Sequence, residues 1–399
     1  MTNLWVDNAP EKFWLCDPSI SSKTLKDAEE IAAVCLGLAG ITETAELFAM
    51  SLGESRFGSR HWELSWTKRA YYLVKPALPR PLTRFLRRHY GNPLDGRTGD
   101  NWPIDPRYVL FQWEVLRQYL ILTGKESVCY RGFWPDGHLF AFVLTHDIET
   151  AGGQAFIREL ADLEENLGFR SCFNFVLERY DVDFGLIQEL RKRGFEVGCH
   201  GLKHDGKLFN SKKGFMKKAA RINAYMKEYG MLGFRAPLTH RNPEWMQALE
   251  MDYDMSFFDT DPFEPIPGGA MSIWPFFLGH FVELPYTLVQ DYTLTSVLGE
   301  TSPRLWLDKV NFLQKYQGMA LLNSHPDYLK EKSAWKIYQE FLIAMKNRDG
   351  YWHALPHEMA NWWRKRALVG LGSSTEQVRM DTAQLRDTGL ELTMHELPK

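Results

Sequence analysis

Short apolar runs alternate with helix-like stretches between residues 137 and 355 of the chain. A strand that is buried on both faces reads as a nearly continuous apolar run, unlike a strand with one face in water. Four runs of this kind predict strands, the first of them with the sequence HLFAFVLT: His138–Thr145, Ser171–Leu177, Phe195–Cys199 and Met319–Asn323.

Helices are predicted between these strands from apolar residues that recur every three or four positions. One spans Phe156–Leu167 and ends at Gly168, and Asn242 followed by Pro243 is a typical helix start. Strands that alternate with helices of this size form parallel βα units, so the predicted fold is an α/β barrel or near-barrel. No G-x-G-x-x-G follows the first strand, which argues against a dinucleotide-binding fold. Two further helices are predicted at Leu186–Leu190 and Trp306–Leu313.

The regions on either side of the predicted barrel lack this alternation of strands and helices. Residues 1–134 form a mixed N-terminal region with a helical stretch predicted at Asp27–Phe48, and the barrel region spans residues 135–366. Residues 367–399 are expected to be a short, poorly ordered tail. The segment Lys68–Arg88 carries seven basic residues and no acidic one. It is either a solvated basic face or a contact for a lipid headgroup, a nucleotide or an acidic partner.

Composition narrows the class of protein. Apolar residues make up 45% and charged residues 24% of the 399 positions, which is typical of a globular chain. The net charge of −3 argues against a nucleic-acid binder. Five scattered cysteines without a C-x-x-C pair indicate a reducing compartment. With no signal peptide and no transmembrane segment visible, we expect a cytoplasmic protein for which peripheral membrane contact stays open.

Candidate chemistry gathers where the predicted strands end, as active groups do in parallel α/β folds. The first strand runs into Asp147 and Glu149, whose carboxylates project to the same side of an extended chain. Such a pair needs a cation or an arginine, unless one of the acids caps the next helix. His200 and His204 follow the third strand, and their spacing places both imidazoles on one face of a helical turn, as in metal-ligand pairs.

Two more strand ends carry suitable residues. Arg235 lies in the run GFRAP, where it is either a packing residue or the partner that keeps a carboxylate ionised. His325 follows the last apolar strand and is either an acid–base group or a hydrogen-bonded loop histidine.

Taken in order, T-H-D-x-E, H-x3-H, R-x-P and L-x3-H-P resemble the successive motifs of the polysaccharide deacetylase family (NodB homology, carbohydrate esterase family 4). The resemblance covers Phe140–Pro326, under half of the chain. It implies an irregular (β/α) barrel of about seven strands, with an N-terminal extension and a short C-terminal tail added to it.

The resemblance also implies roles for single residues. Asp147 matches the catalytic base, Arg235 the arginine that orients the base, and His325 the general acid. Glu149, His200 and His204 match the metal ligands, although the family has Asp at the position of Glu149. The family's fourth motif, an Asp that supports the acid histidine and a downstream Trp, is not clear here. Its candidates are Asp254, Asp259, Asp261 and Trp274, and the segment Leu284–Tyr292 is a further candidate for lining the pocket.

The function implied is a metal-dependent carbohydrate N-deacetylase, a hydrolase that removes an N-acetyl group from an amino sugar or glycan intermediate. The implied cofactor is a divalent metal ion, zinc foremost, and the implied partner is a carbohydrate, free or linked to a lipid or a nucleotide. Two alternatives stay open. The same groups could hydrolyse a cyclic amide or an O-acetyl ester, or the chain could be a non-catalytic relative that binds a glycan or a partner protein.

Overall fold

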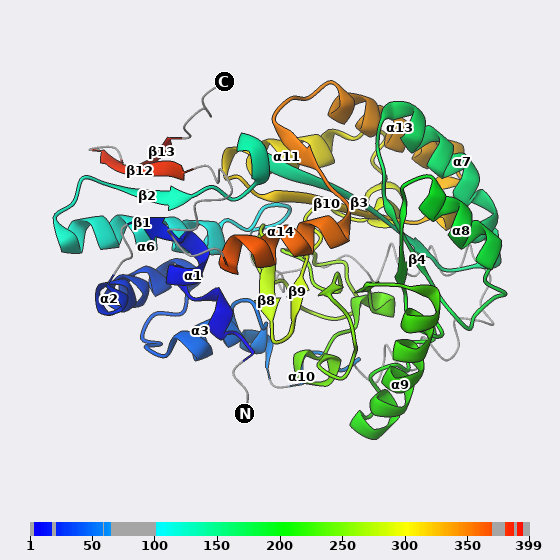
Figure 1. Cartoon of the computed structure of the whole chain (residues 1–399), viewed down its shortest axis with the longest axis horizontal. Helices are drawn as coiled ribbons and strands as arrows, with labels where there is room; N and C mark the ends of the chain where they lie inside the picture. Colours follow the sequence, from blue (N-terminus) through cyan, green and yellow to red (C-terminus); the bar gives the residue numbers. More distant parts are fainter. Residues whose placement is uncertain are drawn as a thin grey trace.

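The computed structural model describes residues 4–17, 21–58, 60–64, 101–368, 380–386 and 389–393. Figure 1 shows a barrel surrounded by helices and, at its left, a smaller unit in which N-terminal helices lie beside strands from both ends of the chain. The basic segment Lys68–Arg88 lies outside the described residues, as do residues 369–379, 387–388 and 394–399 of the predicted tail.

A parallel sheet forms the barrel wall. Its longest strand is β3 (Phe140–Ile148), which is buried at every position, as its apolar run predicted. The spatial order is β10-β3-β4-β5-β6-β7-β9-β8, in which only the last pair is antiparallel. The other strands are β4 (Cys172–Phe175), β5 (Glu196–Cys199), β6 (Gly233–Phe234), β7 (Tyr253–Asp254), β8 (Phe276–Leu278), β9 (Phe281–Glu283), β10 (Met319–Ser324) and β11 (Tyr351–His353), which pairs with the first half of β3.

The chain that continues β9 closes the sheet into a barrel. Tyr286 forms a parallel bridge with Phe258, beyond β7, and Leu288 forms one with Leu322 of β10. The sheet therefore returns to the strand at which it began. The fold is an irregular α/β barrel, as predicted.

Helices follow the strands and cover the outside of the barrel (Figure 1). Gly168 ends α7 in the left-handed conformation, with a φ of 89°, which a residue without a Cβ adopts at little cost. The side chain of Asn242 accepts a hydrogen bond from the backbone N–H of Trp245 and so caps α10, as predicted. The barrel helices are α7 (Ala151–Leu167), α8 (Phe184–Lys192), α9 (Lys212–Tyr229), α10 (Pro243–Met246), α11 (Arg304–Lys315), α12 (Pro326–Leu329), α13 (Lys332–Lys346) and α14 (Pro356–Leu368).

The smaller unit is built around an antiparallel sheet in the order β1-β2-β12-β13. Part of the predicted tail supplies β12 and β13, so the expectation of a tail without regular structure is wrong for those residues. Ala383 of β12 is fully buried. The alternation of apolar and polar residues around it is too short to predict this strand from the sequence. The elements are α1 (Pro10–Trp14), β1 (Cys16–Asp17), α2 (Ser22–Ala32), α3 (Thr44–Met50), α6 (Arg107–Thr123), β2 (Ser127–Arg131), β12 (Met380–Arg386) and β13 (Gly389–Thr393).

The helical stretch predicted at Asp27–Phe48 is interrupted. The helix α2 passes into a 3-10 turn at Ala33–Leu36, and Gly37 then takes a φ of 71°, before α3 begins at Thr44. A glycine with positive φ commonly ends a helix, and the spacing of apolar residues alone does not predict this break.

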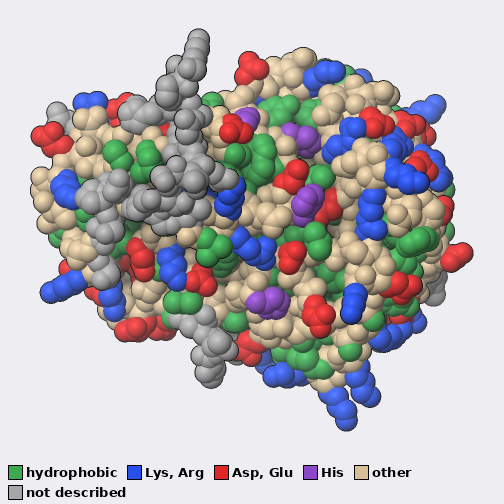
Figure 2. All heavy atoms as spheres, viewed as in Figure 1, with side chains coloured by type: hydrophobic (Ala, Val, Ile, Leu, Met, Phe, Trp, Pro, Cys, Tyr) green, Lys and Arg blue, Asp and Glu red, His purple; other side chains and the backbone are tan. Residues whose placement is uncertain are grey.

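The surface charges agree with the net charge of the sequence, and the helices agree with the lack of a long apolar segment in it. The described side chains of the face in Figure 2 mix acidic and basic groups, as a net charge of −3 predicts. Among the described residues, every helix is too short or too polar to cross a bilayer. All five cysteines are free.

Candidate active site

The carboxyl ends of β3, β5, β6 and β10 bring the six predicted site residues together. Asp147 is the second-last residue of β3 and has 2% of its surface exposed, so its charge needs buried partners. Its Oδ1 accepts hydrogen bonds from Arg235 Nη1 at 3.2 Å and from Asn174 Nδ2 at 3.1 Å, and its Oδ2 accepts one from Asn323 Nδ2 at 2.9 Å.

These contacts decide the ionisation of Asp147. Burial alone would raise the pKa of the carboxyl group, but the positive charges of Arg235 and His325, with the hydrogen bond from Asn323, more than offset burial and hold the pKa well below its usual range. Asp147 is therefore an anion at neutral pH. The predicted pairing of Arg235 with a strand-end carboxylate is present in the structure.

Glu149, His200 and His204 form a second group beside Asp147. One ligand atom from each of the three lies within 4.8 Å of the other two, and His204 Nε2 is 3.1 Å from Glu149 Oε1. Two zinc ligands at about 2.0–2.2 Å from the ion in tetrahedral geometry are roughly 3.4 Å apart, so the pair of His204 and Glu149 has a suitable spacing and the whole group is compact enough to hold a cation. Three protein ligands leave a fourth position open, which is typical of catalytic zinc sites.

The state of His200 also suits a metal ligand. Its Nδ1 lies 2.9 Å from the carbonyl oxygen of Arg235, so Nδ1 carries the proton and the lone pair of Nε2 is free for a cation. Burial lowers the pKa of His200 to about 4, against the opposing charge of Asp147, and the ring is neutral at pH 7.

The two histidines do not lie on a helical turn, contrary to the spacing-based expectation. They lie on an irregular loop after β5, in which Gly201 has a φ of 73°. A Cβ on Gly201 would also come within 3.0 Å of the Pro237 ring, so the loop needs glycine there. The imidazoles converge because the loop folds back, and their ring centroids are 5.3 Å apart.

His325 faces Asp147 from the end of β10. Its Nε2 is 3.9 Å from Asp147 Oδ2, while its Nδ1 is 2.7 Å from Asp291 Oδ1. The other oxygen of Asp291 accepts the backbone N–H of His325 at 3.0 Å. Burial would lower the pKa of His325, but the charge and hydrogen bond of Asp291, with the charges of Glu149 and Asp147, raise it to about 10. His325 is protonated at neutral pH.

Asp291 is thus the acid that supports His325, and the sequence missed it among the candidates for that role. It lies in the segment Leu284–Tyr292, for which the sequence predicts only a place in the lining of the pocket. The only sequence signal for this role is that Asp291 is an isolated acidic residue shortly after Leu288, in the stretch that closes the barrel. The four named candidates have other partners: Asp254 bonds Ser256, Asp259 pairs with Lys309, Asp261 accepts from Tyr286, and Trp274 donates to the carbonyl of Gln317.

Asn174, Asn323 and Thr145 were also missed. Each is a polar side chain on a buried strand, which is a signal that sequence reasoning could have used, because buried polar groups need partners. The alternation of β3 and β10 explains which neighbours belong to the site. His146 and Ser324 point to the opposite face, where His146 Nδ1 lies 2.8 Å from Ser324 Oγ and its Nε2 2.7 Å from Glu164.

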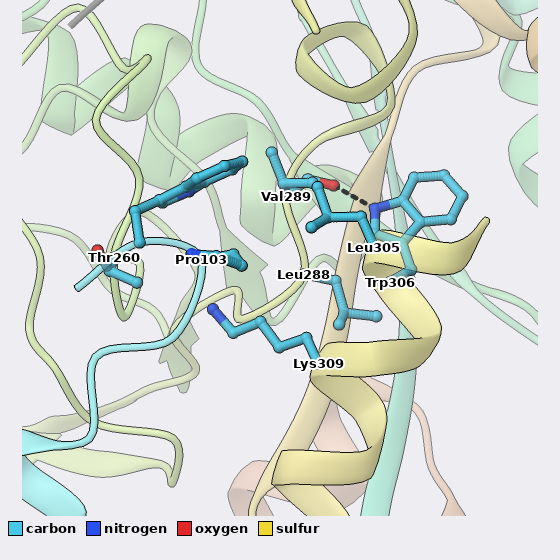
Figure 3. A pocket seen from close by; sticks show the side chains of 8 residues that line it. Pro103, Thr260, Leu288, Val289, Leu305, Trp306 and Lys309 are labelled. Carbon is cyan, nitrogen blue, oxygen red and sulfur yellow. Dashed lines mark hydrogen bonds between the residues drawn. The ribbon is translucent and has the colours of Figure 1, made fainter. Parts of the chain in front are cut away.

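Two hollows lie away from this group. Figure 3 shows the side chains around one of them, among which Pro103, Leu288 and Lys309 lie near the hydrogen bond from Trp306 Nε1 to the carbonyl of Val289. This cavity has a volume of about 10 Å³ and is large enough only for water. A groove of about 640 Å³ separates the N-terminal region from the start of α10 and is lined by residues that include Trp62 and Trp245. Neither hollow is lined by the six residues.

Comparisons with known proteins give matches among solved structures alone: no family model and no curated protein matches the chain. One matching structure, from Mycobacterium smegmatis and described as a polysaccharide deacetylase, has 18% identity, covers 61% of this chain and 97% of its own, and has a TM-score of 0.48. Puue allantoinase has 14% identity, covers 59% and 93%, and has a TM-score of 0.48. Peptidoglycan deacetylase PdaC from Bacillus subtilis has 14% identity, covers 57% of this chain and 93% of its own, and has a TM-score of 0.38. Polysaccharide deacetylases, the family that the motifs resemble, are thus among the matches.

Proposed function

We propose that this chain is a metal-dependent hydrolase that removes an N-acetyl group from an amino sugar or a glycan. One observation carries the proposal: an anionic carboxylate and a protonated histidine, Asp147 and His325, face each other beside a group of three potential metal ligands. A base and an acid with well-separated pKa values are what hydrolysis of an amide needs at neutral pH.

Glu149, His200 and His204 would hold the cation. Imidazole and carboxylate ligands with an open position suit zinc, which we propose as the metal. A cation bound there would polarise the amide carbonyl and lower the pKa of a bound water.

Asp147 would act as the general base and take a proton from the attacking water. Arg235 and the two asparagines keep it ionised and fix the direction of its carboxylate. Its Oδ2 is also 3.8 Å from Nε2 of His200, so the base lies next to the proposed metal ligands.

His325 would donate the proton on Nε2 to the leaving amine. Asp291 accepts a hydrogen bond from Nδ1, so the ring orientation is fixed with Nε2 on the side of Asp147. Without that proton the amine would have to leave as an amide anion, which is a far poorer leaving group.

The proposed substrate class is carbohydrate, and linkage to a lipid or a nucleotide belongs to the same proposal. The experiment is to incubate the zinc-loaded protein with N-acetylated and O-acetylated oligosaccharides and with a cyclic amide, measuring acetate, free amine and ring opening. Acetate and amine released together from the N-acetylated sugar support the proposal. Turnover of the ester or the cyclic amide alone replaces it with one of the alternative hydrolase activities.

Two variants test the roles. His200→Ala is expected to lose both bound metal and turnover, while His325→Ala keeps its metal and loses turnover. A metal-free His200→Ala protein that stays active contradicts the proposed mechanism. A wild-type protein that binds no divalent ion and releases no acetate is the non-catalytic binding protein instead.

A further inference from the structure

Asn323 joins the two charged groups at the centre of the site. It belongs to β10 and pairs in register with Thr145 of β3, so its side chain points into the barrel on the same side as Asp147. Its Oδ1 accepts a hydrogen bond from Arg235 Nη1 at 2.6 Å, and its Nδ2 donates to Asp147 Oδ2 at 2.9 Å. With 1% of its surface exposed, Asn323 is shielded from bulk solvent.

The distances show which partner holds the arginine. Nη1 of Arg235 has two hydrogens and three acceptors, namely Asn323 at 2.6 Å, Thr145 at 2.8 Å and Asp147 at 3.2 Å. The contact with Asn323 is the shortest and the contact with Asp147 the longest. Arg235 is therefore anchored mainly by neutral oxygen atoms. Its positive charge still acts on Asp147, but the two side chains do not form a short bidentate ion pair.

Asn323 also decides which part of Asp147 stays free. Among the described residues, Oδ1 accepts hydrogen bonds from Arg235 and Asn174, whereas Oδ2 accepts one from the amide of Asn323 alone. The unused lone pair of Oδ2 then faces the space next to His200 and His325, at 3.8 and 3.9 Å from their Nε2 atoms. A rotation of the carboxylate would turn this lone pair away.

We infer that Asn323 is a positioning residue for the hydrolytic reaction: by bridging Arg235 and Asp147, it sets the orientation in which Asp147 meets the attacking water. This inference rests on the proposed function. No other side chain of similar size supplies both an acceptor and a donor with this separation. Leucine supplies neither, and aspartate supplies two acceptors, one of them against Asp147.

Two variants separate positioning from packing. Asn323→Leu and Asn323→Asp are expected to lower kcat by about 100-fold, as misplacement of a reacting group by about 1 Å does. KM and zinc content should stay within twofold of the wild type, because the proposed metal ligands do not contact Asn323. Asn323→Asp keeps the volume of the side chain, so a packing role would leave kcat of this variant close to wild type, and that result overturns the inference.

The matched control is Thr287→Val. Thr287 is buried and its hydroxyl donates to the carbonyl of Met319 and accepts from the N–H of Leu321, so it fastens the same strand without contacting the charged groups. We expect a lower melting temperature and an unchanged kcat. A fall in kcat as large as that of Asn323→Leu would mean that strand stability, and not positioning, governs turnover.

A crystal structure of zinc-loaded Asn323→Leu gives a readout that needs no turnover. The expected result is a rotated Asp147 carboxylate beside an unchanged arrangement of Glu149, His200 and His204. An unrotated carboxylate overturns the inference. If the wild type hydrolyses none of the substrates, the proposed function fails, but the orientation of Asp147 still tests what Asn323 does.

Discussion

The Nε2 atom of His325 lies 3.9 Å from Oδ2 of Asp147. This separation is too long for a direct hydrogen bond, and it leaves the proton on His325 and the charge on Asp147. Each residue is held from behind by another group, Asp291 for the histidine and Arg235 for the aspartate. Each side of the site therefore has its own supporting partner, and loss of one partner should move mainly the limb of the pH profile that belongs to the residue it supports.

Asp291→Asn tests the side of the histidine. Burial lowers the pKa of His325 and Asp291 opposes it, so loss of the Asp291 charge should bring the pKa down from about 10. The proton donor is then lost at lower pH, and we expect the alkaline limb of the kcat/KM profile to move down by about one pH unit or more. Asp308→Asn, which removes an exposed acid of α11, is the control. An alkaline limb that coincides with that of the wild type contradicts the pairing.

Glu149→Gln tests the proposed third ligand. Removal of a ligating charge should weaken zinc binding by at least about tenfold, measured by competition with a chelator. Glu149→Asp keeps the charge on a side chain one methylene shorter and should bind zinc with intermediate affinity. Asp147→Asn is expected to keep its zinc and lose turnover. Equal affinity of the Gln variant and the wild type would remove Glu149 from the metal site.

Gly198→Ala tests the support of Asp147 from β4. A Cβ on Gly198 would lie 2.2 Å from Oδ1 of Asn174, so the asparagine must move and its hydrogen bond to Asp147 must change. We expect a loss of about 1–3 kcal/mol in the free energy of unfolding and a lower kcat. Gly152→Ala, in the exposed first turn of α7, is the control and should not destabilise the protein, because the added Cβ meets only the flexible end of Lys330 at close range. Full activity of Gly198→Ala would show that Asn174 is dispensable.

Glu54→Gln tests the buried ion pair that fastens the N-terminal region to the barrel. Burial opposes the charge of Glu54, but Arg241 at both carboxylate oxygens, with His61, lowers its pKa to about 2. Because the pKa is depressed in the folded state, the pair stabilises the protein fully above about pH 4.5 and loses its effect as the pH falls toward 2. Breaking it should cost about 3–5 kcal/mol at pH 7 and less at pH 3, measured by urea unfolding.

The exposed Glu46→Gln is the control for Glu54→Gln and should leave the free energy of unfolding unchanged at both pH values. If the destabilisation by Glu54→Gln is the same at pH 7 and pH 3, Glu54 does not titrate in this range and the pair does not act as described.

Much of the barrel followed from local pattern. The buried strand β3 and the cap at Gly168 were predicted because burial on both faces and helix termination leave signals within a few residues. The rule that active groups gather at the ends of parallel strands points to six residues in the sequence: Asp147, Glu149, His200, His204, Arg235 and His325. The helical turn expected for the two histidines was wrong, because spacing alone does not specify the backbone between them.

The sequence by itself determined which residues carry chemistry and at which strand end each one lies, since both depend on short runs of the chain. Only the tertiary structure decided how these ends face one another. Asp291 comes to His325, Asn323 to Arg235, and β12 to β2 through contacts between residues far apart in the chain. Such contacts depend on how the barrel closes, and a carboxylate or an amide looks the same in sequence whether it is solvated or buried against its partner.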